Sequence, residues 1–263
     1  MLETNITFKQ NPIIRGFFKD NNNINDKDFK NAETNIKSIN KSFSLLNNFD
    51  LDILNYLYYV TQQKYFNYQA ITYTNKNNLS LSFLEIKKKL NIKHKGFKQE
   101  IKNSLENIYN ISLYLKNFKC PITGNLIELQ RTRIISSVTY LADTVEIEFT
   151  KLFMLNVLRH TNQKVNKKIG NFTAIDTKTT LDIKSKFGKR LYEYLISFQG
   201  QGQRNHLCLN IPDLNQLFGL NYKELSRFKS ILERCYPKVF KHLNFSYKIE
   251  KADKKICFEF YIN

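Results

Sequence analysis

The chain has 263 residues, with 41 Lys and Arg against 23 Asp and Glu, which gives a formal charge of +18 and a pI near 9.6. A field of this sign attracts polyanions, so nucleic acid, an anionic membrane or an acidic protein is the expected partner. No run of about 18 apolar residues occurs and the N-terminus lacks the features of a signal peptide, so we expect no membrane span and a cytoplasmic location.

The cysteines Cys120, Cys208, Cys235 and Cys257 are scattered singly, without a Cys-x-x-Cys spacing, and the distant histidines complete no zinc pattern. We therefore expect buried or idle thiols, no metal and no cofactor. The abundance of Asn, Lys, Ile, Phe and Tyr, with no Trp, is typical of the coding bias of an AT-rich genome. Part of the positive charge reflects this bias, so the placement of the charges must decide their role.

Residues 1–40 are polar and rich in asparagine, without a sustained period, and we expect a flexible or loosely attached arm, with or without a function. Beyond the arm, apolar residues recur at helical spacing between Phe43 and Val60. Ser82 followed by Glu85 is typical of a helix start, because both side chains can satisfy amides of the first turn. A third helix is expected from near Lys95.

The middle of the chain is rich in alternating apolar and polar residues, which predicts strands. We expect extended segments at 70–74, 111–116, 126–138 and 145–149, a turn at 121–124, and a helix at 151–159. The charged, aperiodic segment 161–170 is the best linker candidate. The predicted domains are therefore 41–165 and 166–263.

The second half repeats this plan more clearly. A helix is expected from Thr179 to Phe198, then a break at 200–203, a strand at 205–210, and a helix with Pro212 in its first turn, where the missing N–H costs nothing. Gly219 suits the residue that ends this helix. Asn221 is the expected cap of the next helix, with Glu224 as its reciprocal partner.

The last helix, expected from Lys223 to Phe240, spaces apolar residues such as Phe228 and Leu232 toward a core. Two alternating segments, 245–250 and 255–262, then form a hairpin. The order helix, strand, helix, turn, helix, hairpin is that of a winged helix. Because the first domain has a similar order, the predicted fold is α+β, with two tandem winged-helix domains of similar plan.

The polar face of the last helix points to DNA binding. It presents Lys223, Ser226, Arg227, Ser230 and Arg234, with Lys229 at its margin. A recognition helix reads base edges with residues near its N-terminus, and Arg can bond guanine through two donors. A solvated helix face would have the same composition, but the position directly after a helix-turn signal favours DNA reading. Arg227 is the expected base contact.

Other cations are expected to contact phosphates, which set register and affinity, although the four between positions 184 and 190 could instead be local helix charges. They are Lys184, Lys186, Lys189 and Arg190 in the second domain, Arg204, Lys248, Lys254 and Lys255 on its strand and wing, and Lys93, Lys95, Lys98 and Lys102, with 87–89, in the first domain. Arg190 could instead form an ion pair with Glu193, and the lysines of the wing could equally be solvated without contacting DNA. Glu100 and Glu106 weaken the first-domain set, and the run 131–135 could instead pair with another subunit.

No catalytic pattern is present in the sequence. The histidines are never two residues apart, as the metal site of a rolling-circle nickase requires, and no Gly-rich phosphate loop followed by Lys occurs. Neither Gly-x-Ser-x-Gly nor His-Glu-x-x-His is found. We therefore expect a binding protein and not an enzyme.

Two segments resemble the family of iteron-binding plasmid replication initiators. The first is Lys184-Ser-Lys-Phe-Gly-Lys-Arg-Leu-Tyr-Glu-Tyr-Leu195, and the weaker second comprises Leu214-Asn-Gln-Leu-Phe-Gly-Leu220 and Tyr222-Lys-Glu-Leu-Ser-Arg-Phe-Lys-Ser-Ile-Leu232. The resemblance runs from about Phe43 to Ile262. The chain departs from the family pattern after Arg234, where Pro237 is expected to bend or end the helix.

The resemblance implies a tandem winged-helix protein that binds double-stranded DNA at direct repeats of a replication origin as a monomer, helps to open the origin, and recruits host replication proteins such as the replicative helicase. It also implies a homodimer, formed through the first domain, that represses its own gene. A transcriptional repressor without an initiation role is the alternative, and a nickase or a scaffolding protein is a more distant one.

Overall fold

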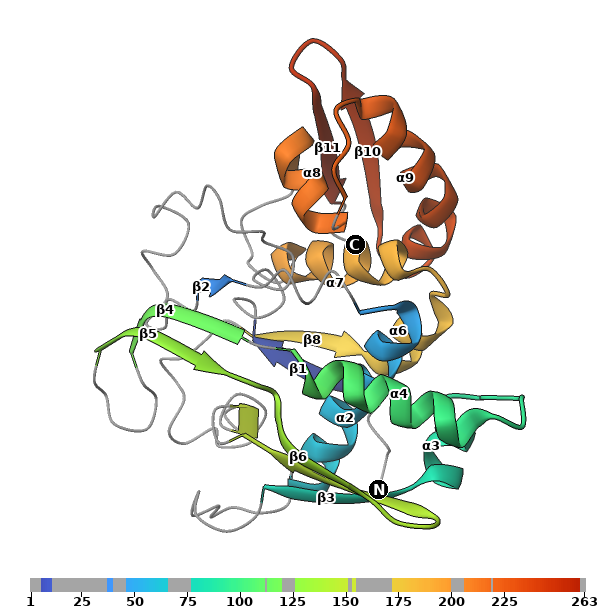
Figure 1. The fold of residues 1–263 in the computed structure, drawn as a ribbon. Coiled ribbons are helices and arrows are strands. Elements are labelled where there is room, and N and C mark those ends of the chain that lie inside the picture. The colour runs from blue at the N-terminus through green and yellow to red at the C-terminus, as the bar shows by residue number, and fades with distance from the viewer. Residues whose placement is uncertain are drawn as a thin grey trace.

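The computed structural model describes residues 6–10, 37–39, 46–65, 77–111, 113–119, 126–150, 153–154, 172–199, 206–218 and 220–260. Two winged-helix units of the same plan follow one another along the chain (Figure 1). Several predicted features lie outside the described residues: the extended piece 70–74, the turn 121–124, the linker 161–170, the break 200–203, Gly219, and all but 153–154 of the helix 151–159.

The first unit consists of a helix, a strand, two helices joined by a turn, and a hairpin that returns to the first strand. These elements are α2 (Asn48–Tyr65), β3 (Asn78–Ser82), α3 (Phe83–Lys89), α4 (Phe97–Tyr109), β6 (Ile135–Tyr140) and β7 (Thr144–Phe149). The strands form an antiparallel sheet in the order β3-β7-β6. The hairpin β6–β7 is therefore the wing of this unit.

The second unit repeats this order. Its elements are α7 (Lys186–Gln199), β9 (His206–Asn210), α8 (Ile211–Phe218), α9 (Leu225–Phe240), β10 (Phe245–Glu250) and β11 (Lys255–Phe260). Its antiparallel sheet has the order β10-β11-β9, so β11 pairs with both β10 and β9, just as β7 pairs with β6 and β3. The α+β fold of two tandem winged-helix units is confirmed.

The predicted helix faces are the buried ones. Phe97, Ile101, Leu105 and Ile108 of α4 lie in the core of the first unit, as the spacing of three and four residues predicts. The Ser82 hydroxyl accepts a hydrogen bond from the Leu84 N–H at 3.2 Å, which confirms the predicted cap of α3. In the second unit, Phe228, Leu232 and Cys235 of α9 are buried, together with Ile256 and Phe258 of β11.

Two further sheets contain strands from the N-terminal region. The strand β1 (Ile6–Gln10) pairs with β8 (Phe172–Asp176), and β2 (Lys37–Ile39) pairs with β4 (Leu113–Lys119), which also pairs with β5 (Leu126–Thr132). The expectation of a loose arm at 1–40 is therefore wrong for β1 and β2. Their partner strands lie more than 70 residues away in the sequence. A short strand with so remote a partner shows no periodicity in the local sequence.

The helix expected from Thr179 to Phe198 is two helices. A short helix α6 (Thr177–Asp182), capped by the Asp176 carboxylate, ends at Ile183, whose backbone is extended and whose side chain is buried. The helix α7 then begins, and the Gly188 N–H donates to the Ser185 hydroxyl at 3.3 Å. A Cβ on Gly188 would approach Ile183 within 2.8 Å, so glycine allows the chain before α7 to pack closely on it.

The prediction of idle thiols is wrong for two cysteines. Cys208 of β9 and Cys257 of β11 face each other across the sheet and form a disulfide. Cys235 is a buried free thiol whose pKa is raised to about 11 by its removal from water, while Cys120 lies outside the described residues. Sequence spacing could not reveal the pair because 49 residues separate its members.

Within the described ranges, none of the helices is both long enough and apolar enough to cross a bilayer.

Candidate nucleic-acid interface

The polar face of α9 is exposed, as predicted. All six side chains assigned to it are on the surface: Lys223, Ser226, Arg227, Lys229, Ser230 and Arg234. Lys223 lies just before the helix, which begins at Leu225. Pro237 neither ends nor shortens α9, which continues to Phe240.

Most polar groups of this face have partners on the same helix. Lys229 lies 3.5 Å from the Glu233 carboxylate, and the Arg234 Nε donates to the Ser230 carbonyl at 3.1 Å. The Ser226 hydroxyl donates to the carboxylate of Glu224 at 3.2 Å. The guanidinium of Arg227, in contrast, has no hydrogen bond or ion pair to any residue that the structure describes. Its donors are therefore available to an external acceptor.

An asparagine of α8 holds the turn that positions α9. The Asn215 side chain accepts from the Tyr222 N–H at 2.6 Å and donates to the Tyr222 carbonyl at 2.8 Å, and its own carbonyl accepts from the Leu220 N–H. The Tyr222 ring lies 5.4 Å from that of Phe228, which anchors the turn to the core. The prediction that Asn221 caps α9 is wrong, because the cap position is occupied by Glu224, whose side chain makes no capping bond.

The Asn215 clamp gives a stability prediction. Replacing Asn215 by alanine should lower the free energy of unfolding by about 1–3 kcal/mol, because two backbone groups of a partly buried turn lose their partners. Urea unfolding followed by circular dichroism measures the change. Asn103→Ala is the matched control, since Asn103 accepts a hydrogen bond only on the exposed face of α4, and it should change stability by less than about 0.5 kcal/mol. Equal effects of both variants would contradict the clamp.

The wing adds further cations beside α9. Lys248 and Lys254 are exposed, and Lys254 occupies the left-handed region with φ of 50° at the hairpin tip. Lys255 is partly buried and lies 3.6 Å from Asp253. Lys251, which sequence reasoning missed, is exposed at the same tip. Arg204 lies outside the described residues.

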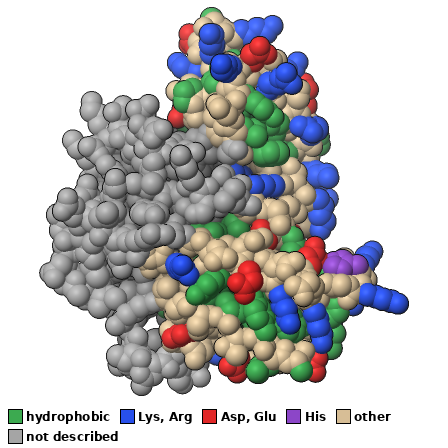
Figure 2. Space-filling model, viewed as in Figure 1, with side chains coloured by type: hydrophobic (Ala, Val, Ile, Leu, Met, Phe, Trp, Pro, Cys, Tyr) green, Lys and Arg blue, Asp and Glu red, His purple; other side chains and the backbone are tan. Residues whose placement is uncertain are grey.

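Lys and Arg side chains gather on one side of the second unit. Figure 2 shows them over the tip of the β10–β11 hairpin and along the edge formed by α9. Lys238 and Lys241 extend this set beyond the predicted residues and are both exposed at the C-terminal end of α9. The predicted set ended at Arg234, because Pro237 was expected to bend or end the helix.

The basic residues of α7 require a correction. Lys189 and Arg190 were expected to contact phosphates, but their side chains are buried, with exposed fractions of 1% and 4%. The Lys189 ammonium forms an ion pair with the Asp52 carboxylate of α2. Because neither group reaches the surface in this structure, neither can meet a phosphate. Lys184 is exposed, and its ammonium donates to the Leu181 carbonyl at 2.8 Å.

These buried groups belong to a polar contact between the two units. The helices α2 and α7 occupy the same place in their units, and they meet through the Lys189–Asp52 pair and through a bond of 3.2 Å from the Asn55 amide to the Glu193 carboxylate. Burial raises the pKa of Asp52 and lowers that of Lys189, against the attraction between the two charges. Burial also lowers the pKa of Arg190 to about 10, opposed by the negative charge of Glu193.

Lys186 gives a pH prediction. Its half-buried position lowers its pKa from 10.5 to about 8, an effect that the Arg190 charge increases and the Asp50 charge opposes. The folded protein then releases this proton at lower pH than the unfolded chain, so this group's contribution to stability rises between about pH 8 and pH 10.5. Lys186→Met should therefore be most stabilising at neutral pH.

Urea unfolding at about pH 7 and about pH 9.5 tests this, with the exposed Lys184→Met as control. The stability advantage of Lys186→Met over the parent should shrink at the higher pH, whereas Lys184→Met should show no such trend. An advantage of the same size at both pH values would contradict the shifted pKa.

The first unit presents a smaller basic set. Lys93 and Lys95 are exposed on the turn between α3 and α4, where Asn91 has a positive φ of 52°. Lys98 instead binds the Asp143 carboxylate at 2.8 Å, and the ammonium of Lys102 lies 5.3 Å from the centre of the Tyr140 ring. The turn, unlike the helix face, therefore offers its lysines to solvent. In Figure 2, basic side chains project where Figure 1 draws this turn.

The family model described as Initiator Replication protein, WH1, matches residues 36–196, which is more than half of the chain. The chain belongs to this family of replication initiators. The match extends from just before β2 to near the end of α7. It therefore covers the whole first unit and most of α7, the first helix of the second unit.

Solved structures support the same architecture for this initiator. It is similar to the Pi initiator protein, whose crystal structure is in complex with iteron DNA, with 11% identity, a TM-score of 0.62, and coverage of 100% of this chain and 99% of that one. It is also similar to domains 2 and 3 of RctB, with 16% identity, a TM-score of 0.54, and coverage of 82% and 83%. At such identities the likeness shows a common fold. No curated protein sequence matches.

Proposed function

We propose that this initiator binds repeated double-stranded DNA sites at the replication origin of a plasmid and starts replication there, in the cytoplasm. The start of α9 enters the major groove, and Arg227 bonds a base edge. Lys223, Ser226, Ser230 and Arg234 flank it, and the lysines of the wing contact phosphates on either side.

The observation that carries this proposal is the exposed basic face of α9, whose central guanidinium has no partner among the described residues. A helix with this face, directly after a helix-turn element and beside a basic hairpin, has the elements that a winged-helix reader of DNA needs. The proposal is supported by the similarity to Pi, a protein crystallised with iteron DNA, over the whole chain.

A second contact comes from the first unit. Lys93 and Lys95 on the turn before α4 would bind phosphates of the same duplex, while Lys98 and Lys102 keep their contacts with Asp143 and Tyr140. Such contacts strengthen binding to any sequence, since the phosphate backbone is uniform. Binding by both units would lengthen the site on the DNA.

The initiator also forms a homodimer in equilibrium with the monomer, and the dimer represses the initiator's own gene. The outer edge of β5 supports this part of the proposal, because β5 is the last strand of the order β2-β4-β5 among the described residues. An open strand edge offers backbone groups to a second chain. Host replication proteins, including the replicative helicase, act after the monomer has bound.

Selection of bound fragments from random DNA tests the central claim. The selected sequences should contain one motif that is repeated in the origin of the plasmid that carries the gene. Fluorescence anisotropy should show that the protein binds this motif more tightly than shuffled DNA. Equal binding to both at moderate salt would refute sequence-specific recognition.

A plasmid that carries the selected repeats and depends on this chain for replication separates an initiator from a repressor without an initiation role. Replication supports initiation, whereas promoter repression without replication supports the repressor. If the protein binds DNA without cleaving it, supercoiled origin DNA should remain intact after incubation with the protein and a divalent metal. Nicked product would indicate an enzyme.

A further inference from the structure

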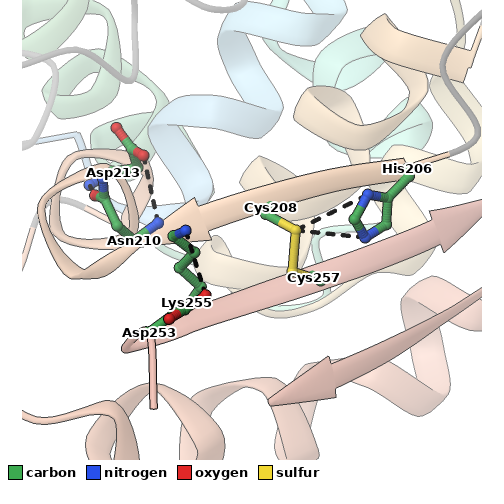
Figure 3. The surroundings of a disulfide bond; sticks show 7 residues. All are labelled: His206, Cys208, Asn210, Asp213, Asp253, Lys255 and Cys257. Carbon is green, nitrogen blue, oxygen red and sulfur yellow. Dashed lines mark hydrogen bonds and ion pairs between the residues drawn. A yellow bond between two sulfur atoms is a disulfide. The ribbon is translucent and has the colours of Figure 1, made fainter. Parts of the chain in front are cut away.

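Three potential metal ligands meet on the sheet that carries the wing. His206 and Cys208 belong to β9 and Cys257 belongs to β11, and one side-chain ligand atom of each lies within 4.8 Å of those of the other two (Figure 3). The proposed DNA binding through Arg227 does not use these three residues.

The strand register places the three side chains on one face. Cys208 and Cys257 are direct partners in the antiparallel pair, with Cα atoms 4.0 Å apart, and His206 precedes Cys208 by two residues. Residues two apart on a strand share a face. The other face of the same strands carries Leu209, Ile256 and Phe258, which are buried in the core. On the ligand face His206 is exposed and Cys208 is partly exposed, whereas Cys257 is buried.

The distances suit a tetrahedral ion after the disulfide opens. Zn–S bonds of about 2.3 Å and Zn–N bonds of about 2.05 Å place sulfur and nitrogen about 3.6 Å apart, and two sulfurs about 3.8 Å apart. The Nε2 of His206 already lies 3.4 Å from the Sγ of Cys208. The two sulfurs must separate, and side-chain rotation at cysteines on neighbouring strands can provide this movement, while all three ligand atoms already lie within 4.8 Å of one another.

We propose that the reduced protein binds one Zn²⁺ through His206, Cys208 and Cys257, with water at the fourth position. Two thiolates and an imidazole are a ligand set that zinc prefers, and three protein ligands leave one position open. The disulfide is the metal-free, oxidised form of the same site. In it both sulfurs are committed to each other.

The conversion between the two forms balances with an external dithiol or phosphine as the reductant. A phosphine takes the oxygen of one water molecule and becomes the phosphine oxide, while the two protons of that water go to the two sulfurs. A dithiol gives two electrons and two protons to the disulfide, which becomes two thiols, while the reductant becomes a disulfide. Zinc then displaces the two thiol protons and binds two thiolates. The opposite change requires loss of the ion and a two-electron oxidant such as a small disulfide.

The surrounding charges are mixed. Glu259 lies across from His206 in the register and Lys248 lies across from Cys257 on β10, so both side chains project from the ligand face. The carboxylate favours a bound cation, and the ammonium favours thiolates over thiols. Lys255, two residues from Cys257 on the same face, is paired with Asp253.

Cobalt(II) titration of the full chain tests the site, because cobalt replaces zinc and its thiolate complexes absorb light. With a phosphine reductant present, one equivalent should bind and give a sulfur-to-cobalt charge-transfer band, which zinc then abolishes. The oxidised protein should give no band. A reduced protein without the band would overturn the proposal.

Substitutions assign the ligands. Cys208→Ser and His206→Ala should each weaken zinc binding more than about tenfold in competition with a chromophoric chelator. Cys235→Ser and His242→Ala, at a cysteine and a histidine outside the cluster, should leave it unchanged. His206 is exposed, so its variant remains informative if Cys208→Ser fails to fold. Unchanged affinity in His206→Ala, or a loss equal to that in His242→Ala, would refute the assigned site.

Discussion

Replacing Lys189 by alanine is expected to lower the free energy of unfolding by about 3–5 kcal/mol, because it leaves the Asp52 carboxylate without its buried partner. The exposed fraction of the Lys189 side chain is 1% and that of Asp52 is 13%, so water can replace little of the lost interaction. Urea or thermal unfolding of the full chain gives the change. The loss should exceed that of any exposed lysine of the second unit.

Controls separate the ion pair from simple loss of volume. Lys184→Ala, on the surface of the same region, should change stability by less than about 0.5 kcal/mol. Replacement of both partners by apolar residues, as in Asp52→Leu with Lys189→Met, should recover stability to within about 1 kcal/mol of the parent, because no buried charge remains. A double variant as unstable as Lys189→Ala would show that the charges are not the cause.

The same pair predicts a DNA-binding result that differs from the expectation from sequence. A lysine that contacts a phosphate contributes about one unit to the slope of log affinity against log salt. Since Lys189 is buried, the slope of Asp52→Leu with Lys189→Met should equal that of the parent. A slope reduced by one unit would show that α7 rotates to expose Lys189 on DNA.

Replacing Arg227 by alanine is expected to weaken binding to the selected DNA repeat by about 1–3 kcal/mol and to relax base preference at one position. The guanidinium has no partner among the described residues, so its removal leaves no buried group unsatisfied and should not alter stability. Anisotropy titrations against the repeat and its single-base variants measure both quantities. The effect on shuffled DNA should be smaller, because only phosphate contacts remain there.

Arg133→Ala provides a matched control, since it removes an exposed guanidinium that lies over the Tyr109 ring in the first unit. It should leave the base preference unchanged. If Arg227→Ala weakened the repeat and the shuffled DNA to the same extent, Arg227 would be a phosphate contact and another residue of α9 would read the bases.

Periodicity predicted those elements whose partners lie nearby in the chain. The three- and four-residue spacing of Phe228, Leu232 and Cys235 identified the inner face of α9, and strict alternation identified β10 and β11. Once the inner face is assigned, the outer face follows from helix geometry. The exposed position of Arg227 was therefore predictable, although its contact with DNA stays a prediction.

Two of the errors concern residues whose role depends on a neighbour that is remote in the sequence. Lys189 and Arg190 resemble surface cations in the sequence, because Asp52, which accompanies Lys189, is 137 positions away. The disulfide between Cys208 and Cys257 joins strands from opposite ends of the second unit. In each case, the residue considered by itself is compatible with an unpaired position on the protein surface.

The local order of apolar and polar residues determined that this chain makes two similar helix–strand–helix–helix–hairpin units and that the last helix is basic. The reason is that the residues buried by a helix or a strand recur along the sequence with the period of that helix or strand. Tertiary packing alone decided which lysine and arginine side chains remain exposed to solvent. Contact between α2 and α7 removes water from Lys189 and makes Asp52 its partner, and antiparallel pairing of β9 with β11 brings two cysteines and a histidine together. Both outcomes arise from distances across space that the spacing of residues along a chain does not encode.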